Sequence, residues 1–256
     1  MAATEQSGTE ADGARSVSLN DEEAVRQIVT DTLFGLWSAV NNLSRLRPTR
    51  RDRYRVTIFG SARPQPGHWV YEQVREMSAG ISAMGCDIVT GGGPGLMEAA
   101  NQGASEGDPE AAAASIGIRV HLPFEQRVNP FVEEAYEHGS FFTRLHQFVL
   151  MSDAYIVAPG GIGTLLEATM IWQLLQVRHL DVPLIFAGPM WRGLVDWTSA
   201  QMLRPGFELA GERDLAIPIC VDNAAEAIAV IRDHHSKWLA EGVAAVTEQP
   251  SVAAPC

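Results

Sequence analysis

GGGPGLME at residues 91–98 and PGGIGTLLE at residues 159–167 are the two stretches that decide how this chain folds. Each follows a short apolar run that is typical of a buried strand, and each opens an amphipathic stretch with helical spacing. A strand that ends in glycines at a helix start leaves backbone N–H groups and the positive helix end open to an anion. Two such turns, the second with a carboxylate one helical turn further on, predict a phosphorylated ligand with reactive chemistry beside it.

The chain from residue 55 onward alternates apolar runs with helical patterns. Strands are expected at 56–59, 86–89, 116–122, 154–158, 184–187 and 217–221. Helices are expected at 70–84, 95–106, 139–151, 163–178, 191–203 and 223–240. This alternation predicts an α/β fold: a Rossmann-like, doubly wound, mostly parallel sheet in a single domain with an N-terminal helical extension. If the strand order reverses between the first and fourth strands, the turns after strands one, two and four meet at one crevice.

The domain organisation follows from composition and periodicity. Residues 1–17 and 242–256 have the composition of disordered tails, and apolar residues at helical spacing predict one helix within residues 18–48. We expect residues 49–241 to form the Rossmann-like, nucleotide-binding catalytic domain. The apolar face of the N-terminal helix packs either on its own domain or against a second subunit.

Composition excludes several classes of partner and location. The 256-residue chain has a formal net charge of −12, which repels nucleic acid and anionic membranes. No apolar run approaches the roughly 18–20 residues that span a bilayer, and the first residues lack the order of a signal peptide. The wide spacing of Cys86, Cys220 and Cys256 predicts neither a disulfide framework nor a zinc site, and the histidines show no metal spacing. A cytoplasmic protein without a metal is therefore expected.

Cofactor classes are limited by the lysine content. Lys237 is the single lysine among 19 Lys and Arg residues. A Walker-type phosphate loop needs a lysine directly after its glycines, and a pyridoxal-phosphate enzyme needs one for its Schiff base. The Gly-x-Gly-x-x-Gly fingerprint of nicotinamide enzymes is missing after the first strand, where residues 60–63 read GSAR. We expect no cofactor.

The second glycine stretch predicts the phosphate seat. Gly160, Gly161 and Gly163 let an anion approach the backbone, and Thr164 adds a hydroxyl donor in the first helical turn. The alternative is a tight strand-to-helix turn that needs a positive φ, for which one glycine would usually be enough.

A carboxylate and a guanidinium are the candidate reactive groups. Glu167 lies four positions after Gly163, so a helical turn brings it to the side of the phosphate seat, where it can stabilise a cation or activate water. The alternative is an acid that merely favours a helix first turn. Arg144 can bind phosphate or ribose hydroxyls and balance Glu167. The alternative is a surface arginine whose stem covers the phenylalanines at 141 and 142.

The two remaining turns predict further contacts to a nucleotide. The turn at 91–95 would let a nucleotide lie along the end of the second strand, and Met97 would offer the base an adaptable apolar contact, unless it is simply a core residue. Ser61 and Arg63 can touch phosphate or base, although Ser61 is also a candidate helix cap. The glycines counted as substrate contacts in these two turns are Gly60, Gly92, Gly93 and Gly95.

These motifs, together with FFTR at 141–144, resemble the LOG (LONELY GUY) phosphoribohydrolase family, long mislabelled lysine decarboxylases. The likeness covers residues 55–230, and FGSAR at 59–63 and LPFEQ at 122–126 are similar to the longer bacterial branch. The resemblance implies hydrolysis of the N-glycosidic bond of nucleoside 5′-monophosphates, such as AMP or cytokinin riboside monophosphates, to free base and ribose 5-phosphate. It implies that Arg144 and Glu167 are catalytic, that Ile162 and Gln126 belong to the substrate site, and that the protein is a homodimer or an assembly of dimers.

Three positions depart from the family pattern. Leu145 stands where a lysine usually follows the arginine, Leu166 where an acid precedes the glutamate, and Met170 where another acid follows one turn later. These replacements favour a second hypothesis, a non-catalytic nucleotide-binding sensor or carrier on the same fold. If Glu167 does not carry the chemistry, Glu98 is the first acid to consider in its place.

Overall fold

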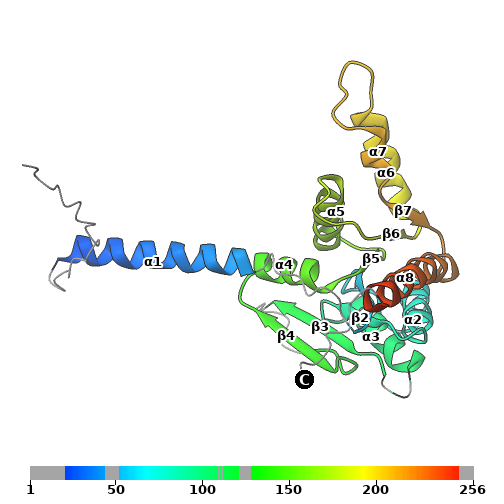
Figure 1. Ribbon diagram of the computed structural model, residues 1–256. Coiled ribbons are helices and arrows are strands. Elements are labelled where there is room, and N and C mark those ends of the chain that lie inside the picture. The colour runs from blue at the N-terminus through cyan, green and yellow to red at the C-terminus, as the bar shows by residue number, and fades with distance from the viewer. Residues whose placement is uncertain (1–20, 44–51, 109, 111, 121–127, 248–256) are drawn as a thin grey trace, which may run out of the picture. The chain divides into compact units, whose positions relative to one another are not determined.

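A seven-stranded parallel sheet lies at the centre of the larger of two units in the computed structural model, residues Thr49–Cys256 (Figure 1). The structure describes residues 21–43, 52–108, 110, 112–120 and 128–247. The strands are β1 (Arg55–Phe59), β2 (Asp87–Thr90), β3 (Ser115–Val120), β4 (Glu134–His138), β5 (Ala154–Val157), β6 (Leu184–Ala187) and β7 (Ile219–Val221). They lie in the order β4-β3-β2-β1-β5-β6-β7, and each neighbouring pair is parallel.

The strand order reverses beside β1, as predicted. The chain runs outward from β1 through β2 and β3 to β4, then returns to place β5 on the other side of β1. Phe59 pairs with Val157, so β1 and β5 end side by side at the carboxyl edge of the sheet. In a doubly wound sheet this is the point at which a ligand crevice forms.

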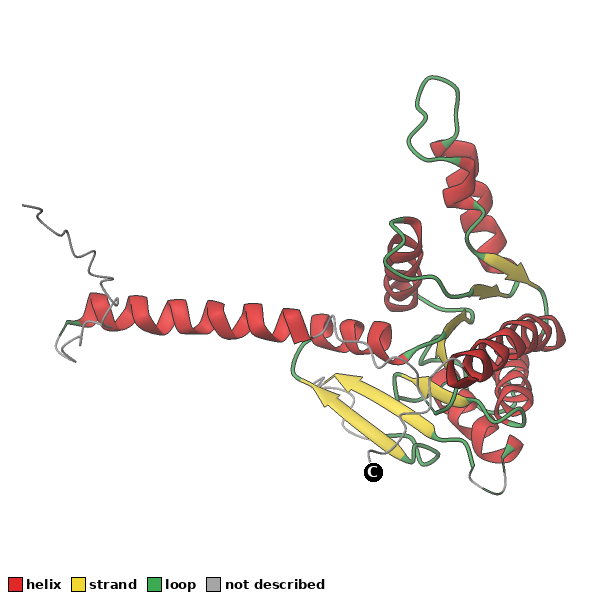
Figure 2. Cartoon of the chain, in the orientation of Figure 1, coloured by secondary structure: helices red, strands yellow, loops and turns green. Residues whose placement is uncertain are grey.

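Helices cover both faces of the sheet (Figure 2). They are α2 (Trp69–Ser82), α3 (Leu96–Gly107), α4 (Phe141–Met151), α5 (Ile162–Gln176), α6 (Pro189–Met202), α7 (Glu212–Leu215) and α8 (Ala224–Thr247). One buried apolar cluster joins the sheet to α2, α3 and α8, and a second joins its other face to α4, α5 and α6. Ile156 belongs to the first cluster, whereas its neighbours Tyr155 and Val157 belong to the second. Burial on both faces explains why the central strands read as continuous apolar runs.

The smaller unit, Met1–Pro48, contains α1 (Glu22–Leu43), within the range predicted for the N-terminal helix. Asp21 starts this helix by accepting a hydrogen bond from the N–H of Ala24 (3.1 Å). Apolar side chains along its described part are exposed, namely Ile28, Val29, Leu33 and Phe34.

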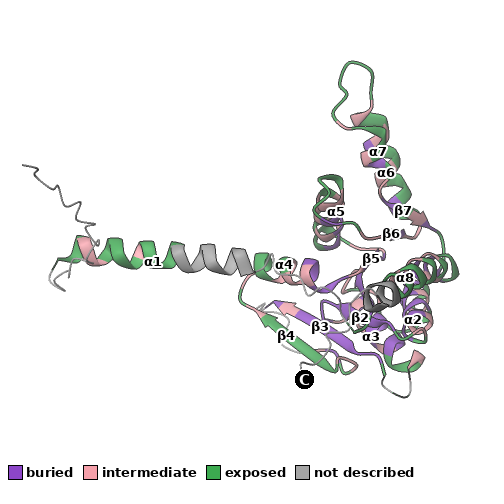
Figure 3. Ribbon diagram, in the orientation of Figure 1, coloured by how far each residue is buried: buried purple, intermediate pink, exposed green. Residues whose placement is uncertain are grey.

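Three features differ from the sequence-based expectations. β4 was not predicted, because its residues EAYEH are mostly exposed at the edge of the sheet and form no apolar run (Figure 3). The four-residue α7 was also missed, because it is too short to show a helical period. α8 continues to Thr247, so the disorder expected from residue 242 is wrong as far as 247; the alanines at 244 and 245 favour a helix there. No helix in the described ranges has the length and hydropathy needed to cross a membrane.

Candidate active site

A cleft of about 840 Å³ opens where β1 and β5 end. It is lined by Gly60, Ser61, Ala62, Arg63, Pro64, His68, Val70, Met97, Arg144, Pro159, Gly160, Gly161, Ile162, Gly163, Thr164 and Glu167. The turns after β1 and β5 therefore meet, as the sequence predicted, and α3 and α4 contribute one residue each. A volume of this size suits a nucleotide-sized ligand, for which pockets of roughly 300–1,000 Å³ are usual.

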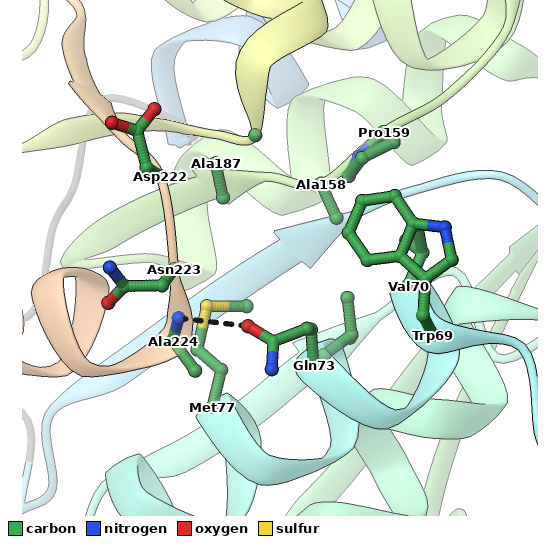
Figure 4. A pocket seen from close by; sticks show the side chains of 12 residues that line it. Trp69, Val70, Gln73, Met77, Ala158, Pro159, Ala187, Asp222, Asn223 and Ala224 are labelled. Carbon is green, nitrogen blue, oxygen red and sulfur yellow. Dashed lines mark hydrogen bonds between the residues drawn. The ribbon is translucent and has the colours of Figure 1, made fainter.

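A second cavity lies beside the cleft, between α2 and the start of α8 (Figure 4). It shares Val70 and Pro159 with the cleft and has a volume of about 40 Å³. Gln73 closes one side by accepting a hydrogen bond from the N–H of Ala224 (3.4 Å). A space of this volume holds about one or two water molecules, so the larger cleft is the candidate site.

The start of α5 presents bare backbone to the cleft. Gly161 occupies the N-cap position, and in the described structure no side chain caps this helix end. The first N–H groups of a helix have no partner within it, so those of α5 are available to an anion. No described atom lies within 4 Å of a Cβ placed on Gly161 or Gly163, and neither has a positive φ. The fold therefore does not require glycine at these two positions, whereas close approach of a ligand would.

Gly160 leaves the space that the Thr164 side chain occupies. A Cβ on Gly160 would overlap the Thr164 hydroxyl oxygen and its Cβ, so only glycine lets the threonine fold back over the turn. Thr164 is 5 % exposed at the wall of the cleft. The alternative of a turn that needs a positive φ therefore applies to none of Gly160, Gly161 and Gly163; position 160 requires glycine because of the Thr164 side chain.

The turn after β1 forms the opposite wall. Ser61 joins the two turns by donating its N–H to the carbonyl oxygen of Pro159 (3.1 Å), and its hydroxyl accepts from the N–H of Arg63 (3.2 Å). Ser61 is therefore not a helix cap; the N-cap of α2 is His68, whose Nδ1 accepts from Val70 N–H (3.3 Å). This bond leaves Nε2 of His68 as the protonated nitrogen. We did not predict His68, because the preceding PQPG, residues 64–67, indicates only a loop.

Arg144 and Glu167 face each other across the floor of the cleft. The distance between Nη1 of Arg144 and Oε1 of Glu167 is 3.4 Å, and the two side chains are only 13 % and 12 % exposed. Nε of Arg144 donates to the carbonyl oxygen of Ile118 (2.9 Å), and the guanidinium lies 5.3 Å from the ring centre of Phe148. Arg144 is thus not a surface arginine that covers residues 141 and 142.

Burial dominates the electrostatics of Glu167. Loss of water around its carboxylate raises its pKa from 4.5 to about 7, and the cation of Arg144 opposes the rise only in part. A carboxyl group that titrates near neutral pH in a cleft, beside one specific charge partner, is typical of a catalytic residue.

The raised pKa predicts that Glu167→Gln stabilises the folded protein at alkaline pH. A native pKa above the unfolded value gives stability that is present below the unfolded pKa and lost as the pH rises through about 7. The gain in the free energy of unfolding should therefore grow from a small value at pH 5 to about 3 kcal/mol at pH 8. Urea unfolding of both proteins at the two pH values measures it, and a gain independent of pH would contradict the assignment.

The triple-glycine turn lies behind the cleft and does not line it. Gly92 donates its N–H to the Thr90 hydroxyl (2.9 Å), and Asn129 donates to the carbonyl oxygens of Gly92 (3.0 Å) and Gly93 (3.0 Å). Gly95 has φ +71° and packs so tightly on the turn after β1 that a Cβ would overlap the Ala62 backbone. Gly92, Gly93 and Gly95 are not among the described residues that line this cleft, so their predicted contacts to a nucleotide stay a prediction.

The remaining predicted residues differ in where the structure places them. The cleft is lined by Arg144, Glu167 and the residues at the start of α5, and also by Gly60, Ser61, Arg63, Met97 and Ile162. Gln126 lies outside the described residues. Glu98 is not among the described residues that line the cleft; after burial, its charge is the second cause that raises the pKa of the Tyr71 hydroxyl to about 12. Leu145, Leu166 and Met170 are not among the described residues that line the cleft. In the described ranges, no group of three or more His, Cys, Asp or Glu is placed to hold a metal ion.

Comparison with known proteins places these features in a family. The model of a family described as possible lysine decarboxylase matches residues 97–231, more than half of the chain. The pyrimidine/purine nucleotide 5′-monophosphate nucleosidase of Escherichia coli K12 is 30 % identical over 126 residues, which are 46 % of this chain and 28 % of the relative. The same enzyme of Escherichia coli O157:H7 gives the same values. The chain thus spans little more than a quarter of these relatives.

Two solved structures share the fold. The molybdenum cofactor binding protein of Rippkaea orientalis superposes with a TM-score of 0.54 at 20 % identity, over 73 % of this chain and 98 % of that one. The molybdenum cofactor carrier protein of Chlamydomonas reinhardtii gives a TM-score of 0.52 at 20 % identity, over 72 % and 99 %. At this identity the likeness extends to the fold alone. With more than half of its length matched by the family model, the chain belongs to the family described as possible lysine decarboxylases, the LOG family.

Proposed function

We propose that the protein hydrolyses the N-glycosidic bond of nucleoside 5′-monophosphates, AMP first among them, to free base and ribose 5-phosphate. The observation that carries this proposal is the buried pair of Arg144 and Glu167, which lies in one cleft with the open glycine backbone of α5. The nucleosidase relatives, which act on nucleotide 5′-monophosphates, support the same class of reaction.

The proposal separates an anchor from the reacting centre. The N–H groups at the start of α5 hold the 5′-phosphate, and this remote binding energy positions the ribose over Glu167. As the C1′–N bond breaks, its electron pair goes to the base and positive charge grows on the sugar ring. Glu167 in its ionised form stabilises that charge or orients the attacking water, while Arg144 holds a phosphate or ribose oxygen. Water oxygen bonds to C1′, and one water proton ends on the base nitrogen.

The family's description as possible lysine decarboxylases fits this chain poorly. Pyridoxal-phosphate-dependent decarboxylation needs a lysine amine for its Schiff base. The single lysine, Lys237, pairs with Asp233 on α8 (2.6 Å), and its side chain is 67 % exposed. It does not belong to the set of described residues that line the cleft.

Chromatographic product analysis with a panel of nucleoside and deoxynucleoside monophosphates tests the proposal. We expect equal amounts of free base and sugar phosphate from at least one nucleotide. Tight binding of AMP without any release of base would instead establish the sensor or carrier function, which the replacements at Leu145, Leu166 and Met170 favour. Absence of both binding and release would reject the two functions together.

The anion seat predicts that AMP binds more tightly than adenosine. The difference should be about tenfold or more in Kd, equivalent to about 1.4 kcal/mol, because only AMP can use the N–H groups of α5. Calorimetry with both ligands measures it. Gly161→Ala should fold normally, since no described atom lies within 4 Å of the new Cβ, and should reduce the difference. Equal affinities in the parent protein would reject the seat.

We also propose that the protein forms a homodimer, or an assembly of dimers, through the surface beside the cleft. Large apolar side chains of α4 and α5 are exposed there, namely Phe141 (48 %), Phe142 (85 %), Ile162 (83 %) and Leu166 (51 %). Large apolar side chains that remain exposed are typical of a protein interface. Light scattering should give at least twice the chain mass of 27.8 kDa at micromolar concentration, and Phe142→Ser should weaken the assembly. A mass of one chain at all concentrations would contradict the proposal.

A further inference from the structure

We propose that Gly91 is a positioning residue for the reaction, because the Arg144 guanidinium occupies the space that a β-carbon at position 91 would need. The triple-glycine turn then acts on catalysis through Arg144, without touching the nucleotide. This inference rests on the proposed function for its kinetic consequence, but the packing on which it depends can be tested without any activity.

The need for glycine at position 91 comes from its neighbours and not from the backbone. Gly91 is buried and has no positive φ, so the local conformation would accept other residues. A Cβ at this position would overlap Nη2 of Arg144 and would come within 2.6 Å of the Met97 sulfur. The methionine side chain is flexible and can move aside. The guanidinium is therefore the group that conflicts with any side chain at position 91.

Arg144 has little room to retreat from such a clash. Its Nε is bound to the carbonyl oxygen of Ile118 (2.9 Å), its Nη1 faces Glu167 (3.4 Å), and its Nη2 is the atom beside Gly91. The ring of Phe148 lies against the guanidinium, 5.3 Å from it. All three nitrogen atoms thus have a neighbour, and a displaced guanidinium loses either the carbonyl of β3 or the carboxylate of Glu167.

The turn cannot yield either, because a buried hydrogen-bond network holds it. Asn101, which is 0 % exposed, accepts from the Thr90 hydroxyl (2.6 Å) and from the Asn129 side-chain amide (3.0 Å), and donates to the Ser115 hydroxyl (2.9 Å). The same Thr90 hydroxyl accepts from the N–H of Gly92, the residue next to Gly91. Moving the turn would break buried hydrogen bonds, so a side chain at position 91 displaces Arg144 instead.

Gly91→Ala tests the kinetic part, with Gly193→Ala as the matched control. Gly193 lies on the exposed surface of α6, and no described atom comes within 4 Å of its added Cβ. Gly91→Ala should lower kcat for the best nucleotide by about tenfold or more, whereas the control should keep it. The limb of the pH–rate profile that reports Glu167 should also move to higher pH, because the displaced Arg144 no longer opposes the rise in the pKa of Glu167.

A double-mutant cycle with Arg144→Ala separates positioning from general damage to the turn. In the Arg144→Ala background the guanidinium is gone, so Gly91→Ala should change kcat by less than about twofold. It should also lower Tm by much less than it does in the parent protein. Equal losses of Tm in both backgrounds would overturn the inference. The Tm measurements need no activity, so they still test the positioning role of Gly91 if Gly91→Ala folds poorly or if the parent releases no base. Failure of the parent to release base would count against the proposed function alone.

Discussion

Glu167→Gln is expected to lower the turnover of AMP by roughly 10²-fold or more, while Kd for AMP stays within several-fold of the parent value. The amide has the shape of the carboxyl group but cannot carry its negative charge. A charge that matters mainly when the sugar ring becomes cationic contributes to the transition state far more than to the bound substrate. Single-turnover kinetics and calorimetry measure the two quantities separately.

The chain offers a matched control for this experiment. Glu98 is also a glutamate in the first turns after a glycine motif, but it is not among the described residues that line the cleft. Glu98→Gln should therefore leave turnover unchanged. An active parent whose Glu167→Gln variant keeps its rate would show that the carboxylate is wrongly assigned. A loss of rate in Glu98→Gln would then indicate that Glu98 is the carboxylate required for the reaction.

The parent itself should become more active as the pH rises through about 7. The proposed mechanism uses the ionised carboxylate, and burial raises the pKa of Glu167 to about 7, so half of the molecules carry the charge near neutral pH. The same burial that would suit the group to its proposed role lowers the stability of the fold above this pH, which is a usual conflict between activity and stability.

Arg144→Ala is expected to weaken AMP binding by about tenfold or more and to lower turnover at pH 7 by roughly 10²-fold. In the proposed mechanism the Arg144 guanidinium, unlike Glu167, binds an oxygen of the substrate before any bond breaks, so both binding and rate should depend on it. Its loss should also raise the pKa of Glu167 further, because the positive charge that opposes the effect of burial is removed, and the ionised fraction at neutral pH should fall. The activity that remains should recover in part at higher pH.

Arg204→Ala is the control for this variant. Arg204 also lies over a phenylalanine, with its guanidinium carbon 5.5 Å from the ring centre of Phe207, but it is exposed and is not part of the cleft lining in the described residues. Its removal should leave Kd, kcat and the pH profile unchanged. A variant of Arg144 that loses rate but keeps full affinity and the same pH profile would contradict a direct contact with the substrate.

Much of the fold was legible in the order of residues along the chain. Central strands such as β1 and β5 are buried on both faces, so they could be predicted from their continuous apolar runs. The alternation of these runs with helical patterns predicted a parallel sheet. β4 could not be predicted, because an exposed edge strand needs no apolar residues. It pairs with β3 through backbone groups, which every sequence possesses.

The candidate site could be predicted from the sequence only in part. The motif spacing predicted that Gly161, Gly163 and Glu167 share one helix start, and the structure places all three in the cleft. His68 escaped because nothing in its loop distinguishes it from other polar loop residues. Gly92 and Gly95 were read as ligand contacts, because a sequence shows that a glycine is present but not whether a ligand or the protein occupies the space beside it.

Local periodicity and glycine placement thus determined the fold class, the two glycine turns and the helix that carries Glu167. Only the tertiary structure brought Arg144 to within 3.4 Å of that carboxylate, from a different helix and 23 residues away. Only burial raised the pKa of Glu167 to about 7, and only the packing of α4 against β3 placed the guanidinium on Gly91. The physical reason is that helix and strand patterns follow from neighbours along the chain, whereas desolvation and steric exclusion depend on which distant residues share one small volume.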